Sequence, residues 1–68
     1  MRKRYIETDF YGTICLVERY DIDFSESFVD MYQDDEDCGY YYGELWCEDI
    51  DSVTSDMVEE QIIENLNC

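Results

Sequence analysis

Apolar and polar residues alternate along the first twenty positions, which is the pattern of half-buried β-strands. Over residues 3–10, Ile6 and Phe10 fall on one side of an extended chain and charged residues fall mainly on the other. Residues 13–20 are apolar and β-branched in their first half, which predicts a second strand. Gly12 suits the tight turn between them, so the two segments predict a β-hairpin.

Residues 21–33 fit two patterns. Phe24, Phe28 and Met31 recur at helical spacing, with polar residues before them that suit an N-cap. The second half of the segment also alternates as a strand does. We predict a strand, because residues 34–39 form a natural hairpin loop to the segment that follows.

Residues 39–48 predict a further strand that is rich in aromatic side chains. One face of it carries three residues that we expect in the core: Tyr41, Leu45 and Cys47. The opposite face mixes rings with carboxylates and is expected to stay partly exposed; its members are Tyr40, Tyr42, Glu44, Trp46 and Glu48.

Residues 52–66 predict a C-terminal helix. Its N-cap is expected among three residues, Asp51, Thr54 and Ser55. An apolar stripe that would pack on the sheet follows at helical spacing: Val58, Ile62 and Leu66. Together the elements predict an α+β fold, with a small antiparallel sheet of three or four strands packed against one C-terminal helix in a single domain over residues 1–68.

Composition supports a folded chain with a thin aromatic core. Of the 68 residues, 46% are hydrophobic and 16% are aromatic, which is too apolar for a disordered acidic tail. A domain of this size buries only about 60% of its unfolded surface, so we expect no deep catalytic cleft.

Charge is the most informative global property. The chain has 19 Asp and Glu against 4 Lys and Arg, for a net charge of −15. All four bases lie within the first nineteen residues, so residues 20–68 carry sixteen acids and no base. Self-repulsion of this size destabilises the compact state. It therefore indicates a strongly negative field with a function, a halophilic setting, or a cation to bind.

The acids gather in two arrays. Four are consecutive before the aromatic strand, namely Asp34, Asp35, Glu36 and Asp37. Another group follows the predicted helix at i, i+4 and i+8 with one flanking residue: Asp56, Glu60 and Glu64, beside Glu59. Helical neighbours at these spacings lie roughly 5–6 Å apart. This spacing is comparable to the distance along the backbone between neighbouring phosphates of one strand. A duplex, with both strands counted, carries one charge per roughly 1.7 Å of helix axis.

Most enzyme chemistry is disfavoured by what the chain lacks. It contains no His, its sole lysine is Lys3, and its three glycines are isolated, so neither a nucleophile–base pair nor a phosphate-binding loop is expected. We expect no enzyme, no cofactor and no dedicated metal site. A calcium-binding loop aligned on Gly39 puts Cys38 and Leu45 at ligand positions, which leaves only a weak divalent-cation binder as a third hypothesis.

Four cysteines and the absence of a signal peptide or a long apolar run predict a reduced, cytoplasmic protein without a membrane span. A Cys38–Cys47 disulfide is the less favoured alternative. Self-association through the rings, giving a homodimer, stays open.

Carboxylates and tyrosines are combined in two stretches, DDEDCGYYYGELWCE and SDMVEEQIIENL. In size, charge and these stretches, the chain resembles the class of small acidic phage proteins that mimic DNA. That class includes inhibitors of uracil-DNA glycosylase, anti-restriction proteins and anti-CRISPR proteins. The resemblance implies a stoichiometric inhibitor that acts in the host cytoplasm.

Such an inhibitor would occupy the DNA- or RNA-binding groove of a basic host protein, such as a nuclease, a CRISPR effector or a DNA-repair enzyme. It would not bind nucleic acid or membrane itself. The expected partner-binding residues are the two acid arrays and the exposed face of the aromatic strand. The alternative is a protein-binding module that mimics nothing, such as a host transcription inhibitor or an adaptor, in which the rings dominate.

Overall fold

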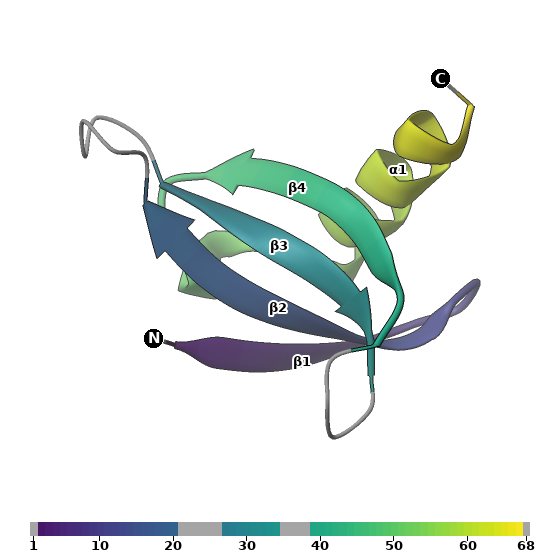
Figure 1. The fold of residues 1–68 in the computed structure, drawn as a ribbon, viewed down its shortest axis with the longest axis horizontal. Coiled ribbons are helices and arrows are strands. Elements are labelled where there is room, and N and C mark those ends of the chain that lie inside the picture. The colour runs from purple at the N-terminus through teal and green to yellow at the C-terminus, as the bar shows by residue number, and fades with distance from the viewer. Residues whose placement is uncertain (1, 21–26, 35–38, 68) are drawn as a thin grey trace.

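The chain folds as a four-stranded antiparallel sheet with one C-terminal helix on one of its faces, which confirms the predicted α+β class (Figure 1). This computed structural model describes residues 2–20, 27–34 and 39–67. The strands are β1 (Lys3–Thr8), β2 (Gly12–Tyr20), β3 (Ser27–Gln33) and β4 (Tyr41–Cys47), in that spatial order. A short 3₁₀ turn, η1 (Ile50–Ser52), leads into helix α1 (Ser55–Leu66).

The predicted hairpin of β1 and β2 is confirmed, with Thr8 opposite Gly12 at its closed end. Gly12 has a φ of 74°, a conformation that suits glycine. The buried Thr8 hydroxyl donates to the Gly12 carbonyl oxygen at 2.8 Å and accepts from the Tyr11 N–H at 3.2 Å. The turn therefore satisfies its own buried polar group.

The strand interpretation of the ambiguous segment is confirmed for its second half. β3 pairs with β2 from Ser27 to Gln33, and the Asp34 N–H extends the pairing by donating to the Thr13 carbonyl. β3 and β4 are antiparallel neighbours, as the predicted hairpin requires. Residues 21–26, and residues 35–38 within the acidic loop, lie outside the described residues.

The core lies between one face of the sheet and α1. Ile14, Leu16, Val29 and Met31 project from the sheet, and two α1 side chains meet them; all are fully buried. The predicted helix stripe is therefore right for Val58 and Ile62. It is wrong for Leu66, which is 53% exposed because the last turn of α1 extends beyond the covered part of the sheet (Figure 1).

Both ends of α1 are capped. The N-terminal cap is one of the three residues that the sequence predicted, and the C-terminal cap is formed by backbone hydrogen bonds. Thr54 is the N-cap, and its hydroxyl accepts from the Met57 N–H at 3.3 Å. The helix contacts β4 and β1, the two edge strands, so it crosses the sheet. One of its amides, Asn65 Nδ2, donates to the Tyr42 carbonyl at 3.0 Å and ties the helix to the start of β4.

A β-bulge at the start of β4 exchanges the predicted faces of Tyr41 and Tyr42. Met31 pairs with Gly43 but Tyr32 pairs with Tyr41, so Tyr42 is an extra residue between the two pairs. Gly43 has a φ of 113°, which lets the chain absorb the extra residue. Strict alternation predicted Tyr41 inside and Tyr42 outside. That prediction was wrong, since Tyr42 packs against the core and Tyr41 is 45% exposed on the other face.

Candidate protein-interaction surfaces

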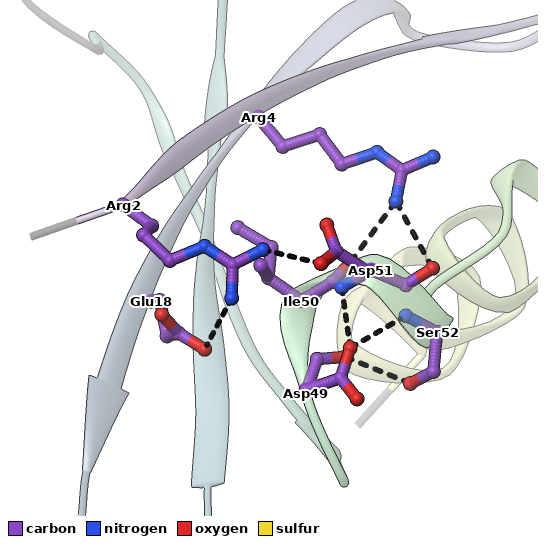
Figure 2. Close-up of polar contacts among 7 residues, drawn as sticks. All are labelled: Arg2, Arg4, Glu18, Asp49, Ile50, Asp51 and Ser52. Carbon is purple, nitrogen blue, oxygen red and sulfur yellow. Dashed lines mark hydrogen bonds and ion pairs between the residues drawn. The ribbon is translucent and has the colours of Figure 1, made fainter.

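The basic N-terminus holds the fold together and does not form a free arm. Arg2 Nη2 lies 2.6 Å from Asp51 Oδ2, and Arg2 Nη1 lies 3.8 Å from the buried carboxylate of Glu18 (Figure 2). Arg4 Nη1 donates to the carbonyl oxygens of Ile50 and Asp51, each at 3.2 Å. Both arginines thus join β1 to the 3₁₀ turn η1.

The turn that receives these arginines is itself capped by a carboxylate. Asp49 Oδ1 accepts from the N–H groups of Asp51 at 2.7 Å and Ser52 at 3.0 Å (Figure 2). Ile50, between them, is buried in the core. An acidic segment that the sequence marked only as the end of the sheet is therefore a structural clasp.

The remaining arginine is engaged on the face of the sheet away from α1. Arg19 Nε lies 3.1 Å from Asp30 Oδ2, and its guanidinium carbon lies 4.7 Å from the ring centre of Phe28. Arg19 Nη2 also lies 3.8 Å from the Glu44 carboxylate. Asp30, which is 2% exposed, accepts a second hydrogen bond from the Tyr41 hydroxyl at 3.2 Å.

Each arginine therefore binds groups of the strands or of η1, and none binds a carboxylate on the outer face of the helix among the described residues. Asp56, Glu60 and Glu64 are exposed there, on the side opposite Val58 and Ile62. Within the described ranges, these three carboxylates make no ion pair. We call this set the α1 acid stripe.

Glu59, which the sequence grouped with this stripe, has a structural role. Its Oε1 accepts from the Asp9 N–H at 2.6 Å and fixes the β1–β2 turn to the helix. Glu59 is half-buried, whereas the members of the α1 acid stripe are exposed. It is thus the least available of the predicted helix carboxylates.

Exposed rings gather on the sheet face away from α1, which we call the open face. Tyr41 packs on Tyr32 with ring centres 5.2 Å apart, and Trp46 packs on Phe28 at 4.6 Å. Trp46 is 49% exposed, and Tyr5 on β1 is similarly exposed. Of these residues, only Trp46 was predicted as a contact residue.

A second row of rings lies where the β1–β2 turn meets the start of β4. Tyr40 contacts Tyr42 with ring centres 4.9 Å apart, and Tyr42 contacts Tyr11 at 5.4 Å. The Tyr42 hydroxyl donates to Gln33 Oε1 at 3.2 Å, so this tyrosine is held in place. In this row, Tyr40 was predicted as a contact residue and is well exposed. Phe10, at the nearby turn, is also exposed but was not predicted as a contact residue.

The structure places the predicted contact residues on separate parts of the molecule. The α1 acid stripe lies on the helix side of the sheet, while Glu44 and Trp46 lie on the open face, so these do not form one continuous surface. Glu48 is exposed just after β4. Of the four consecutive acids, Asp34 is exposed, and the others, Asp35, Glu36 and Asp37, lie outside the described residues.

Sequence reasoning missed Tyr41 as an exposed ring because it assumed an unbroken strand. An available signal was Gly43, since a glycine inside a strand pattern often marks a bulge. Burial contributes most to raising the pKa of Tyr41, to about 12, and the carboxylates of Asp30 and Glu44 add to it. Tyr41 therefore acts as a hydrogen-bond donor throughout the physiological range.

Neither metal nor thiol chemistry is supported by the described part of the chain. It holds no group of three side chains placed to ligate a metal ion. Cys15 and Cys47 are free thiols, and Cys38, the other half of the alternative disulfide with Cys47, lies outside the described residues. Burial, followed by the nearby carboxylates of Asp49 and Glu18, raises the pKa of the Cys47 thiol.

None of the helices within the described ranges is long and apolar enough to cross a membrane. Comparison of the chain with protein-family models, curated proteins and solved structures gave no match.

Proposed function

We propose that this protein is a stoichiometric inhibitor that presents nucleic-acid-like charge to a basic DNA- or RNA-binding protein and blocks its binding groove. The observation that carries the proposal is the α1 acid stripe, which is exposed and makes no ion pair with the described residues, while each arginine is engaged elsewhere. A surface helix kept only for solubility gains from interleaved Lys or Arg. This helix has none.

The spacing of the stripe suits a partner that binds phosphates. Successive carboxylates one helical turn apart lie roughly 5–6 Å from each other along a rigid element. Lysines and arginines arranged for a nucleic-acid backbone meet negative charges at a comparable interval. The net charge of −15 would steer such a partner into contact and would also repel nucleic acid itself.

The size of the chain fits this role better than catalysis. Its core is one layer of sheet against one helix, and the histidine-free sequence offers no common general base. The resemblance to phage DNA mimics supports, as part of the proposal, a target among host defence proteins in the host cytoplasm, such as a nuclease or a CRISPR effector. A DNA-repair enzyme is a further target of the same chemistry.

Competition with nucleic acid tests the proposal. A partner captured from a bacterial lysate on the immobilised protein should be released by duplex DNA or by RNA of matched charge. Affinity should fall steeply between low and physiological salt, because several carboxylate–cation contacts are screened together. If the partner binds nucleic acid and this protein at the same time, the mimicry proposal is wrong.

A charge reversal on the helix separates binding from stability. Glu60→Lys places a cation four residues from both Asp56 and Glu64, so the variant should be more stable by about 0.5–1 kcal/mol while its affinity for the partner falls at least tenfold. Urea denaturation and a binding titration measure the two effects. Glu7→Lys, an equal charge change at an exposed position of β1, is the control and should retain most of the affinity.

The open face favours a second candidate, a protein-binding module that does not mimic nucleic acid. Trp46 and Tyr41 are each nearly half exposed there, and aromatic residues dominate the energetics of many interface centres. For this function Trp46→Ala should cost more than 2 kcal/mol of binding free energy, with little dependence on salt. Loss of binding on Glu60→Lys but not on Trp46→Ala would exclude it.

A further inference from the structure

Within the described part of the chain, the outer side of β4 has no neighbouring strand, because β4 is the last strand in the sheet order. The register between β3 and β4 determines which backbone groups of β4 point towards β3 and which point outward. Gln33 donates to the Tyr40 carbonyl at 2.7 Å, and Asp34 donates to β2, so alternate β3 residues from Gln33 backwards face β4. Beyond the bulge, the inward positions of β4 are those opposite these residues.

The backbone groups of Glu44 and Trp46 therefore point outward from the sheet. They lie opposite Asp30 and Phe28, whose own backbone groups face β2. The Tyr42 carbonyl is occupied by Asn65 Nδ2, which closes the outward row at the bulge. From there to the end of β4, the structure shows a short template for one more strand.

This edge is only partly protected, by the bulge and the Asn65 contact at its start. Natural sheets guard their edges with Lys, Pro, bulges or covering elements. β1, the opposite edge, begins with Lys3 and Arg4 and is linked to η1 by arginines. β4 has neither Lys nor Pro, and its bulge lies at one end only.

Charge decides what this edge can accept. The Glu44 side chain is about two-fifths exposed, with Arg19 Nη2 3.8 Å from its carboxylate. Glu48, just beyond the strand, is exposed and makes no ion pair with any described residue. A second copy of the chain would bring these carboxylates against their own equivalents, with −15 on each molecule. A strand rich in Lys or Arg would instead pair with them, and its apolar residues would meet Trp46 and Tyr41 on the open face.

We infer that the β4 edge binds an extended, basic segment of the partner protein as a fifth strand. Main-chain hydrogen bonds to Glu44 and Trp46 supply affinity, while the carboxylates select a cationic strand. The inference rests on the proposed function for the basic character of the partner. It adds a contact on the sheet edge, separate from the α1 acid stripe.

Amide exchange on the full chain tests this binding mode directly. The probe is a capped octapeptide of alternating Lys and Val, and the matched control is spermine, a polyamine of equal charge without a peptide backbone. At low ionic strength the peptide should slow hydrogen exchange of the Glu44 and Trp46 amides at least fivefold. Spermine should leave both amides unchanged.

A variant pair checks the same point on the protein. Trp46→Pro removes one outward N–H, a change that edge strands tolerate, and Trp46→Ala removes the ring but keeps the N–H. Binding of the peptide should weaken at least threefold more for the proline variant than for the alanine variant. Circular dichroism confirms that both variants keep their fold, and the amide-exchange result on the unaltered chain stands without them.

Three outcomes would overturn the inference. Equal protection by peptide and spermine would show binding by charge alone, and protection on β1 would place the strand at the other edge. Protection in the absence of peptide that grows with protein concentration would show that a second copy occupies β4. None of these affects competition with DNA, so the proposed function and the edge inference can fail separately.

Discussion

At the scale of single residues, the carboxylate of Asp30 is buried and held by two partners. It receives Arg19 at 3.1 Å and the Tyr41 hydroxyl at 3.2 Å, on a side chain that is 4% exposed. An ionised carboxylate is tolerated at such a site only with partners of this kind. One of the four basic residues of the chain, Arg19, therefore pairs with a buried carboxylate.

Removing the guanidinium should therefore destabilise the fold. Arg19→Met leaves Asp30 with one hydrogen-bond partner among the described contacts, and it should lower the free energy of unfolding by about 1–3 kcal/mol. This loss is smaller than that for breaking a fully buried ion pair, because the Arg19 side chain is itself 47% exposed. Urea denaturation measures the change. Lys3→Met, with the same loss of charge at a residue that makes no ion pair with the described residues, should have a small effect.

The same cluster predicts a loss of stability at high pH. Folding raises the pKa of Tyr41 from 10.0 to about 12, so the folded state holds this proton more tightly than the unfolded state. The resulting stability is complete below pH 10 and is lost as the pH rises towards 12. Tyr41→Phe has no proton to lose, so its free energy of unfolding should decline less steeply over this interval. Parallel curves for the two proteins would contradict the prediction.

At the scale of elements, the bulge of β4 has the largest effect on the surface. One extra residue exchanges the faces of Tyr41 and Tyr42 and leaves Leu45 in the core. A side chain on Gly43 would collide with the Asn65 amide, which holds the Tyr42 carbonyl. The Asn65 contact therefore links the bulge of β4 to α1.

Gly43→Ala should cost about 1–3 kcal/mol of stability, because alanine is strained at a φ of 113° and displaces Asn65. Chemical denaturation of Gly43→Ala, Asn65→Ala and the double variant separates the two causes. If the collision matters, the double variant loses less than the two single variants together. Full additivity would assign the whole cost to the backbone.

At the scale of the whole molecule, charge is distributed unevenly between structure and surface. Arg2 forms ion pairs at η1 and Arg19 on the open face, and Arg4 donates to backbone carbonyls of η1. Among the described residues, the α1 acid stripe makes no ion pair. Salt screens attraction and repulsion alike. With 19 acids and 4 bases, repulsion is the larger total.

Added sodium chloride should therefore stabilise the free protein. The free energy of unfolding from urea titrations should rise between about 10 mM and about 300 mM salt, over which the Debye length falls from roughly 30 Å to below 10 Å. Sodium sulfate at equal ionic strength distinguishes screening from general salting-out. A fall in stability with sodium chloride would show that the arginine pairs outweigh the repulsion.

Local sequence patterns determined the elements of this protein. Alternation predicted the β1–β2 hairpin, and loop residues favoured a strand within residues 21–33, where the structure has β3. Thr54, with the apolar spacing of Val58 and Ile62, predicted α1. Each signal lies within one turn or one strand, so no distant contact was needed to recognise it. The excess of acids was also evident directly from the composition.

Tertiary structure alone decided which of these residues face solvent. The Tyr41–Tyr42 exchange depends on a register shift against β3, and Leu66 is exposed because the sheet ends beneath it. Arg2 meets Asp51 across 49 positions of sequence. Such contacts depend on where packed elements bring distant residues together, and periodicity along the chain carries no record of that. The sequence determined how much charge the protein carries, and the fold determined which charges remain available to a partner.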